Sequence, residues 1–294
     1  MYQILTMESE FPMLKKMDCA GKWLDLSKPA VMGILNLTPD SFYDGGRYAT
    51  LNEQLRRTEQ MLKEGASIID LGAVSTRPGA REVCQTGELE RLLPSLKAIR
   101  HHFPDAILSV DTFRPLIARA VVEQGADMVN DIYGGRFEEG MFETMARLKV
   151  PYILMHLKGN PEQMQENPTY SDVVAEVTYF LEQQTTQCRA KGMKQVIIDP
   201  GFGFGKTTLH NFQLLSRLES LKSLGFPLMV GISRKSLIHR FLEITPETAL
   251  NGTTVLHTIA LLKGADILRV HDVKEAMEAI RLTGMLDEQE LLSL

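Results

Sequence analysis

The chain has 294 residues, of which 44% are hydrophobic and 23% are charged, and its formal net charge is −5. These values are typical of a globular protein, and the length suits one β/α barrel with short additions. The net negative charge excludes a general basic field for nucleic acid. The sequence has no apolar run of about 20 residues for a membrane helix and no signal-peptide pattern near its start. We therefore expect a cytoplasmic protein without a nucleic-acid or membrane partner.

Short apolar runs alternate with longer amphipathic segments along the chain. Continuous apolar runs are typical of parallel strands that are buried on both faces. We predict strands at 31–36, 67–72, 107–111, 128–131, 152–156, 196–199, 228–233 and 267–271. Helices are predicted at 51–64, 88–101, 115–124, 173–190 and 274–282, among other segments.

Alternating strands and helices favour an α/β fold, a single (β/α)8 TIM barrel. A doubly wound open sheet is the alternative, because the number of strands does not prove closure. Residues 17–29, which include Trp23, are predicted to form a hairpin under the barrel floor. We expect residues 1–16 to be an N-terminal extension and residues 17–294 to be one barrel domain that includes the hairpin.

Each predicted strand ends near a polar residue: Asn36, Asp70, Asp111, Asn130 with Asp131, His156, Asp199, Ser233 and His271. In a β/α barrel the carboxyl ends of the strands form the active site. We therefore expect a ring of amides, carboxylates and imidazoles around one mouth. Asp70 or Ser233 alone could instead cap a helix.

The segment 199–206 is similar to a phosphate-binding P-loop, but Pro200 stands where that motif requires glycine. We expect its glycines to let the backbone approach a flat ligand closely instead. Lys235, Arg269 and His271 follow strands seven and eight, where many barrels bind phosphate. Arg269 and His271 are two residues apart and so share one face of a strand. These features predict a local anion site.

Three acceptors, Asp111, Asn130 and Asp199, come from different predicted strands. They suit a ligand edge with adjacent N–H and NH2 donors, and pterins carry such an edge. A carboxylate pair for glycoside hydrolysis uses similar residues, but it fits poorly with the cations and the glycine-rich loop.

These residues resemble the dihydropteroate synthase family from about residue 22 to residue 283. The matching motifs are 32–42, 75–80, 130–132, 155–156 with 159–161, 199–206, 233–236 and 269–272. The resemblance implies a transferase of folate biosynthesis that joins 6-hydroxymethyl-7,8-dihydropterin diphosphate to p-aminobenzoate. It also implies Mg²⁺, a homodimer and a target of sulfonamides.

The resemblance further implies a role for each matching residue. Lys235, Arg269 and His271 would be catalytic, and Asn36 would bind Mg²⁺. The pterin would be bound by Asp111, Asn130, Asp199, Lys235 and Arg269, and the diphosphate by Thr76, Arg269 and His271. The p-aminobenzoate would be surrounded by Thr76, Pro78, Phe42, Phe204 and Ser233. Two mobile loops would contain Pro39, Asp40, Ser41, Phe42, Ser75 and Arg77.

One departure from the family pattern precedes the motif at 75–80. The family usually has Gly-Gly-Glu there, whereas this chain has Gly72, Ala73 and Val74. A diverged paralogue that binds pterin with weak or no turnover is therefore one alternative. A pterin-dependent methyltransferase domain is another, although it would not need a diphosphate site.

Overall fold

The structure is a computed structural model that describes residues 14–37, 50–74, 83–159, 164 and 168–286. Its parallel sheet contains β3 (Ala30–Asn36), β4 (Ile68–Gly72), β5 (Ile107–Asp111), β6 (Met128–Asp131), β7 (Tyr152–Met155), β8 (Val196–Asp199), β9 (Met229–Val230) and β10 (Ile267–Val270). The strand order is β8-β7-β6-β5-β4-β3-β10-β9. A parallel bridge between Ile198 and Leu228 joins the two ends. The predicted barrel is confirmed, and the open-sheet alternative is wrong.

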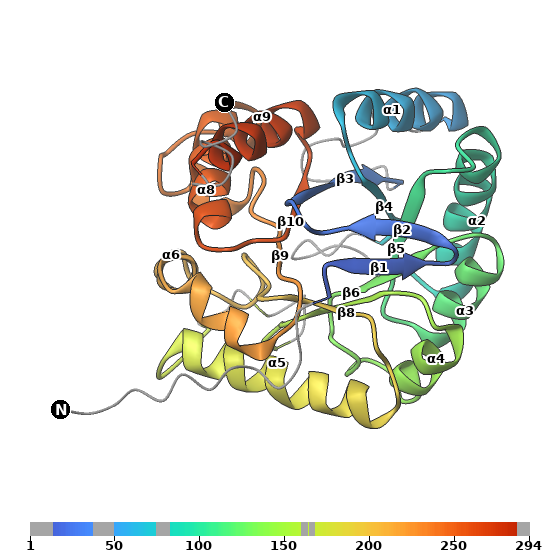
Figure 1. The fold of residues 1–294 in the computed structure, drawn as a ribbon, viewed down its shortest axis with the longest axis horizontal. Coiled ribbons are helices and arrows are strands. Elements are labelled where there is room, and N and C mark those ends of the chain that lie inside the picture. Colours follow the sequence, from blue (N-terminus) through green and yellow to red (C-terminus); the bar gives the residue numbers. More distant parts are fainter. Residues whose placement is uncertain (1–13, 38–49, 75–82, 160–163, 165–167, 287–294) are drawn as a thin grey trace.

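The helices surround these strands (Figure 1). They are α1 (Leu51–Glu64), α2 (Gln85–His102), α3 (Pro115–Glu123), α4 (Met141–Leu148), α5 (Val173–Ala190), α6 (Thr208–Ser216), α7 (Ser236–His239), α8 (Leu250–Leu262) and α9 (Val273–Gly284), with 3-10 turns η1 (Leu218–Leu224) and η2 (Pro246–Thr248). The predicted helices 51–64 and 173–190 have the same bounds as α1 and α5. Thr50 and Glu53 form a capping box at the start of α1, which explains why this boundary is readable from sequence.

Successive strand residues point alternately toward the helices and into the barrel. The outward residues, such as Val31, Ile69 and Leu108, belong to the main core beneath the helices. The inward residues nearest the amino ends of the strands form an apolar floor: Met32, Ile68, Ile107, Met128, Ile153, Ile197, Met229 and Ile267. Two residues further along, five of the strands place a polar side chain in the inward layer: Asp70, Ser109, Asn130, Asp199 and Arg269. The polar interior is thus confined to the carboxyl end of the barrel.

An antiparallel hairpin of β1 (Lys16–Cys19) and β2 (Lys22–Asp25) closes the opposite end. Its apolar side chains, including Met17 and Leu24, pack on the apolar floor, and the hairpin lies across that end of the barrel in Figure 1. This confirms the predicted hairpin. Trp23, however, is 68% exposed, because its alternate position on β2 turns it away from the floor.

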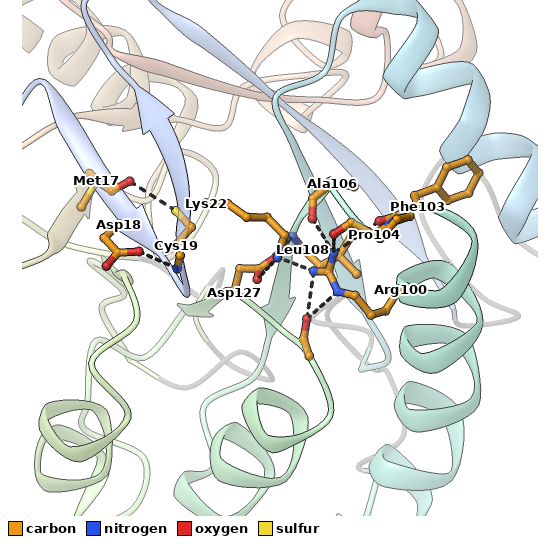
Figure 2. A network of polar contacts seen from close by, with 12 residues as sticks. Met17, Asp18, Cys19, Lys22, Arg100, Phe103, Pro104, Ala106, Leu108 and Asp127 are labelled. Carbon is orange, nitrogen blue, oxygen red and sulfur yellow. Dashed lines mark hydrogen bonds and ion pairs between the residues drawn. The ribbon is translucent and has the colours of Figure 1, made fainter.

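Figure 2 shows how the hairpin is tied to the barrel through Asp127, which is almost fully buried. One carboxylate oxygen of Asp127 accepts a 2.7 Å hydrogen bond from Lys22 of β2. The other accepts from the Leu108 backbone N–H and from the Arg100 guanidinium. Because both carboxylate oxygens have donors, the buried charge is well compensated. No helix in the described part of the chain is long and apolar enough to cross a membrane.

Candidate active site

A buried ion pair lies at the centre of the polar layer. Asp70 is fully buried, and its Oδ2 accepts hydrogen bonds from Arg269 Nε at 2.7 Å and from Asn130 Nδ2 at 3.1 Å. The guanidinium of Arg269 also lies 3.4 Å from Asp111 Oδ2. Burial alone would lower the pKa of Arg269, but Asp70 and Asp111 raise it above its usual value. Arg269 is therefore a fixed positive charge inside the barrel.

Asp111 lies at the mouth, beside this ion pair. In the strand register, Gly72 lies between Asn36 of β3 and Asp111 of β5. A Cβ atom at Gly72 would lie 3.7 Å from Asn36 Oδ1 and 3.9 Å from Asp111 Oδ2. The missing side chain thus leaves room between two polar groups. Burial raises the pKa of Asp111 to about 7, although Arg269 opposes this shift, so Asp111 can gain or lose a proton near neutral pH.

Asp199 and Lys235 are a second set of opposite charges at the mouth, and each affects the pKa of the other. Asp199 is 4% exposed, and its Oδ1 accepts a 2.7 Å hydrogen bond from the Gly201 N–H. Burial raises the pKa of Asp199, and Lys235 counteracts it. Lys235 Nζ donates to the Phe202 carbonyl at 2.6 Å and lies 4.6 Å from the centre of the Phe204 ring. Burial lowers the pKa of Lys235 to about 8 against the field of Asp199.

Ser233 and His271 are joined at the ends of neighbouring strands. The His271 backbone N–H donates to Ser233 Oγ at 3.2 Å, and Arg57 of α1 donates to the His271 carbonyl. The neighbouring Arg234 does not belong to this group. It makes two hydrogen bonds to Asp272, at 2.8 and 2.9 Å, and is 6% exposed. Arg234 therefore anchors the loop that carries Ser233 and Lys235.

The structure brings most of the predicted polar residues together, but two strand ends do not contribute. Asp131 accepts hydrogen bonds from the Tyr152 hydroxyl and the Tyr133 N–H. His156 contacts the Phe180 ring of α5, with the ring centres 5.0 Å apart. Asp131 occupies an outward position of β6, and His156, which follows the last residue of β7, packs against a helix. The expectation that every strand end lines the mouth is therefore wrong for these two residues.

Asp70 belongs to the expected ring of polar residues, and the alternative that it caps a helix is wrong. Its isolated charge within the apolar run Ile68–Gly72 was an available signal. A carboxylate inside a buried strand requires a partner, but the sequence does not reveal that the partner is Arg269.

Several predicted site residues lie outside the described part of the chain: Pro39, Asp40, Ser41, Phe42, Ser75, Thr76, Arg77 and Pro78. The departure from the family pattern immediately precedes the second of these segments. Ala73 is fully buried, and its carbonyl accepts a 3.1 Å hydrogen bond from Arg91 of α2. Val74 is half-buried.

Comparison with known proteins identifies the family. The chain matches the model of the pterin binding enzymes over residues 32–271. It is 45% identical to the dihydropteroate synthase of Escherichia coli K12 over 269 residues, which is 91% of this chain and 95% of that protein. The Synechocystis enzyme is 47% identical over 253 residues, covering 85% and 87% of the two chains.

Solved structures agree with this likeness. The dihydropteroate synthase of Yersinia pestis with a sulfonamide drug has a TM-score of 0.89 at 40% identity, covering 93% of this chain and 99% of that one. The Xanthomonas albilineans enzyme in complex with 7,8-dihydropteroate has a TM-score of 0.82 at 35% identity, covering 94% and 99%. The chain therefore belongs to the dihydropteroate synthase family.

Proposed function

We propose that the polar mouth of this barrel performs the reaction of its family. The chain is a transferase that condenses 6-hydroxymethyl-7,8-dihydropterin diphosphate with p-aminobenzoate, giving 7,8-dihydropteroate and diphosphate. We place the reaction at the mouth because two carboxylates and two cations come together there, above the apolar floor: Asp111, Asp199, Lys235 and Arg269. Acceptors and cations are thus available together at the carboxyl end of the barrel.

The pterin is proposed to bind across Asp111, Asn130 and Asp199. Carboxylates accept hydrogen bonds from adjacent N–H and NH2 groups, and an Asn side chain can both donate and accept. Asn130 is oriented by its 3.1 Å hydrogen bond to Asp70, which leaves its amide oxygen available as an acceptor. Lys235, held by the Phe202 carbonyl, would donate to the edge of the ring, and Arg269 would stack on its face.

The diphosphate is proposed to lie against Arg269 and His271, with Thr76 from outside the described residues. In the reaction, the amine nitrogen of p-aminobenzoate bonds to the exocyclic CH2 of the pterin, the C–O bond to diphosphate breaks, and the amine loses a proton. An arylamine is already unprotonated at neutral pH, so no strong base is needed. The residues mainly stabilise the departing anion, which is electrostatic catalysis by fixed positive charges.

We propose that Mg²⁺ binds at this site together with the diphosphate substrate, which would supply some of its oxygen ligands. The described residues contain no group of three or more His, Cys, Asp and Glu side chains that could hold a metal. Mg²⁺, however, often binds through one or two protein oxygens, waters and substrate phosphates. The amide oxygen of Asn36, beside the space at Gly72, could be such a ligand. The ion would neutralise charge on the diphosphate.

The p-aminobenzoate is proposed to approach from the side of Phe204 and Ser233. The ring of Phe204 lies next to Lys235 and offers an apolar face to an aryl ring. The other proposed contacts, Phe42, Thr76 and Pro78, belong to segments outside the described residues. Sulfonamides would compete for the same place, as the drug complex of the Yersinia pestis relative suggests.

The chain is also proposed to act as a cytoplasmic homodimer. Apolar side chains on neighbouring elements α6 to α8 are exposed: Leu209 by 65%, Phe241 by 64%, Val255 by 50% and Leu262 by 60%. Val255 and Leu262 are seven residues apart and share one face of α8. Sedimentation at micromolar concentration tests this proposal. A monomeric wild-type protein, or a dimer that Leu262→Lys leaves intact, would contradict it.

A diphosphate-release assay with both substrates tests the function. Release should require p-aminobenzoate and Mg²⁺, and dihydropteroate should form in equal amount. Release without the amine would indicate hydrolysis, and turnover that persists in chelator would remove the role of the metal. Binding of pterin without any product would favour the diverged paralogue.

A further inference from the structure

The loop after β8 is packed closely against the end of β7. Gly201 and Gly205 both have left-handed φ angles, of 71° and 58°. A Cβ atom at Gly201 would lie 1.9 Å from the His156 carbonyl oxygen, and one at Gly205 would lie 2.4 Å from that of Lys158. Only glycine permits this approach. The distance between this loop and the backbone after β7 is therefore fixed by the two glycines.

Lys206, the last residue of the P-loop-like segment, is turned into this loop. It is 2% exposed, and its Nζ is 2.9 Å from the Gly201 carbonyl oxygen, 3.1 Å from that of Phe204 and 2.9 Å from His156 Nδ1. An ammonium group has three N–H donors, and three acceptors surround it here. Lys206 thus holds the loop together and does not reach toward a phosphate group.

The His156 side chain is suited to accept from Lys206. Burial and the charge of Lys206 both lower the pKa of His156 well below its usual value, which favours a neutral imidazole with one acceptor nitrogen. Burial also lowers the pKa of Lys206 to about 7, against the field of Asp199. This pair connects the end of β7 to the loop after β8.

The same loop determines the position of two proposed site residues. The Phe202 carbonyl accepts from Lys235 Nζ at 2.6 Å, and the Phe204 ring lies 4.6 Å from that nitrogen. Movement of the loop would therefore displace the ammonium of Lys235 and the aryl contact of Phe204 together. Arg269 lies on β10, where its Nε donates to Asp70, and His271 follows β10, where its backbone N–H donates to Ser233.

We propose that Lys206, with His156, is a positioning residue for this reaction. It fixes the loop after β8, and the loop in turn fixes Lys235 and the surface that receives p-aminobenzoate. Its kinetic consequence rests on the proposed function.

The main test replaces Lys206 with methionine, which has a similar length but no donors. Lys222→Met is the matched control, because Lys222 is a partly buried lysine that pairs with Asp266 near the floor of the barrel. A misplaced group costs up to about a hundredfold in rate, so we expect Lys206→Met to raise the KM for p-aminobenzoate about tenfold or more. The affinity for inorganic diphosphate, measured by calorimetry, should stay within about twofold of the wild type. The control should change neither quantity.

Two further variants test the His156 contact. Asn places an oxygen near the position of Nδ1, whereas Leu removes the acceptor, so His156→Asn should retain a lower KM than His156→Leu. This comparison decides the matter if Lys206→Met does not fold. Equal KM values for the two His156 variants, or a wild-type KM in folded Lys206→Met, would overturn the proposal. A smaller active fraction alone would lower kcat and leave KM unchanged.

Hydrogen exchange separates this inference from the proposed function. The backbone amides of 201–205 should exchange faster in Lys206→Met than in wild type or Lys222→Met, even if no dihydropteroate forms. Absence of wild-type turnover would overturn the function. Unchanged loop exchange in folded Lys206→Met would overturn the positioning role.

Discussion

Asp70 Oδ2 accepts a 2.7 Å hydrogen bond from Arg269 Nε inside the barrel, across 199 residues of sequence. The carboxylate is fully buried, and the same oxygen also holds Asn130. One side chain therefore orients a proposed pterin-binding amide and the main proposed diphosphate-binding cation. Buried ions of this kind are stable only when each has its partner.

Arg269→Ala should therefore destabilise the protein by about 3–5 kcal/mol, because it leaves Asp70 as an unpaired buried charge. Adding Asp70→Asn should recover a large part of this loss, since the unpaired charge is removed. Urea unfolding of both single variants and the double variant measures the effect. Strictly additive losses would show that the two side chains do not depend on each other. Turnover should remain low in the double variant, because Arg269 is still missing.

His271→Ala should weaken binding of the dihydropterin diphosphate without weakening binding of the bare hydroxymethyl pterin. A hydrogen bond to a charged group contributes about 1.5–3 kcal/mol, which corresponds to a loss of about tenfold or more in affinity. Calorimetry with the two ligands checks the difference. Equal losses for both would remove His271 from the diphosphate site.

The strands were predictable because buried parallel strands are continuous apolar runs, and seven of the eight agree with the structure within one or two residues at each end. The exception is β9, predicted at 228–233 but limited to Met229–Val230. The chain turns soon afterwards, at Arg234, whose φ angle is 53°. The hydrogen bonds of Arg234 to Asp272 and to η2 hold this turn, and no local pattern reveals them.

The site was only partly predictable, because strand ends show which residues are polar but not which way they point. Asn130 faces the mouth and its neighbour Asp131 faces the helices. Lys206 and His156 are 50 residues apart, so their contact depends on the loop geometry. Asp70 is on β4 and Arg269 is on β10. They can meet because β3 is the single strand between β4 and β10 in the strand order of the barrel.

Asp111 should make the stability of the ligand-free protein depend on pH. Burial raises its pKa to about 7 from an ordinary value of 3.8. Between these values the folded state binds a proton that the unfolded state lacks, so this contribution is lost as the pH rises from about 4 to 7. Asp111→Asn should flatten the free energy of unfolding over that range. An unchanged slope between pH 5 and pH 7 would contradict the shift.

Val74→Glu should change turnover only modestly, although it restores the family's usual residue. Val74 is half-buried beside Ala73, whose backbone is already held by Arg91. A glutamate there could pair with a cation or orient the following segment, and a partly exposed pair contributes about 0–1 kcal/mol. That corresponds to less than about a tenfold change in rate.

Lys235→Ala provides the contrast, and turnover should nearly cease. It removes a half-buried cation that faces Asp199 and is held by the Phe202 carbonyl. Opposite charges inside a barrel add little net stability compared with apolar residues, so folding alone does not account for this lysine, and its presence favours an active enzyme over a diverged paralogue. Steady-state assays of wild type, Val74→Glu, Lys235→Ala and the distant control Lys222→Ala measure both effects. If the wild type forms no dihydropteroate but Val74→Glu does, the missing carboxylate is essential and the chain is the diverged paralogue.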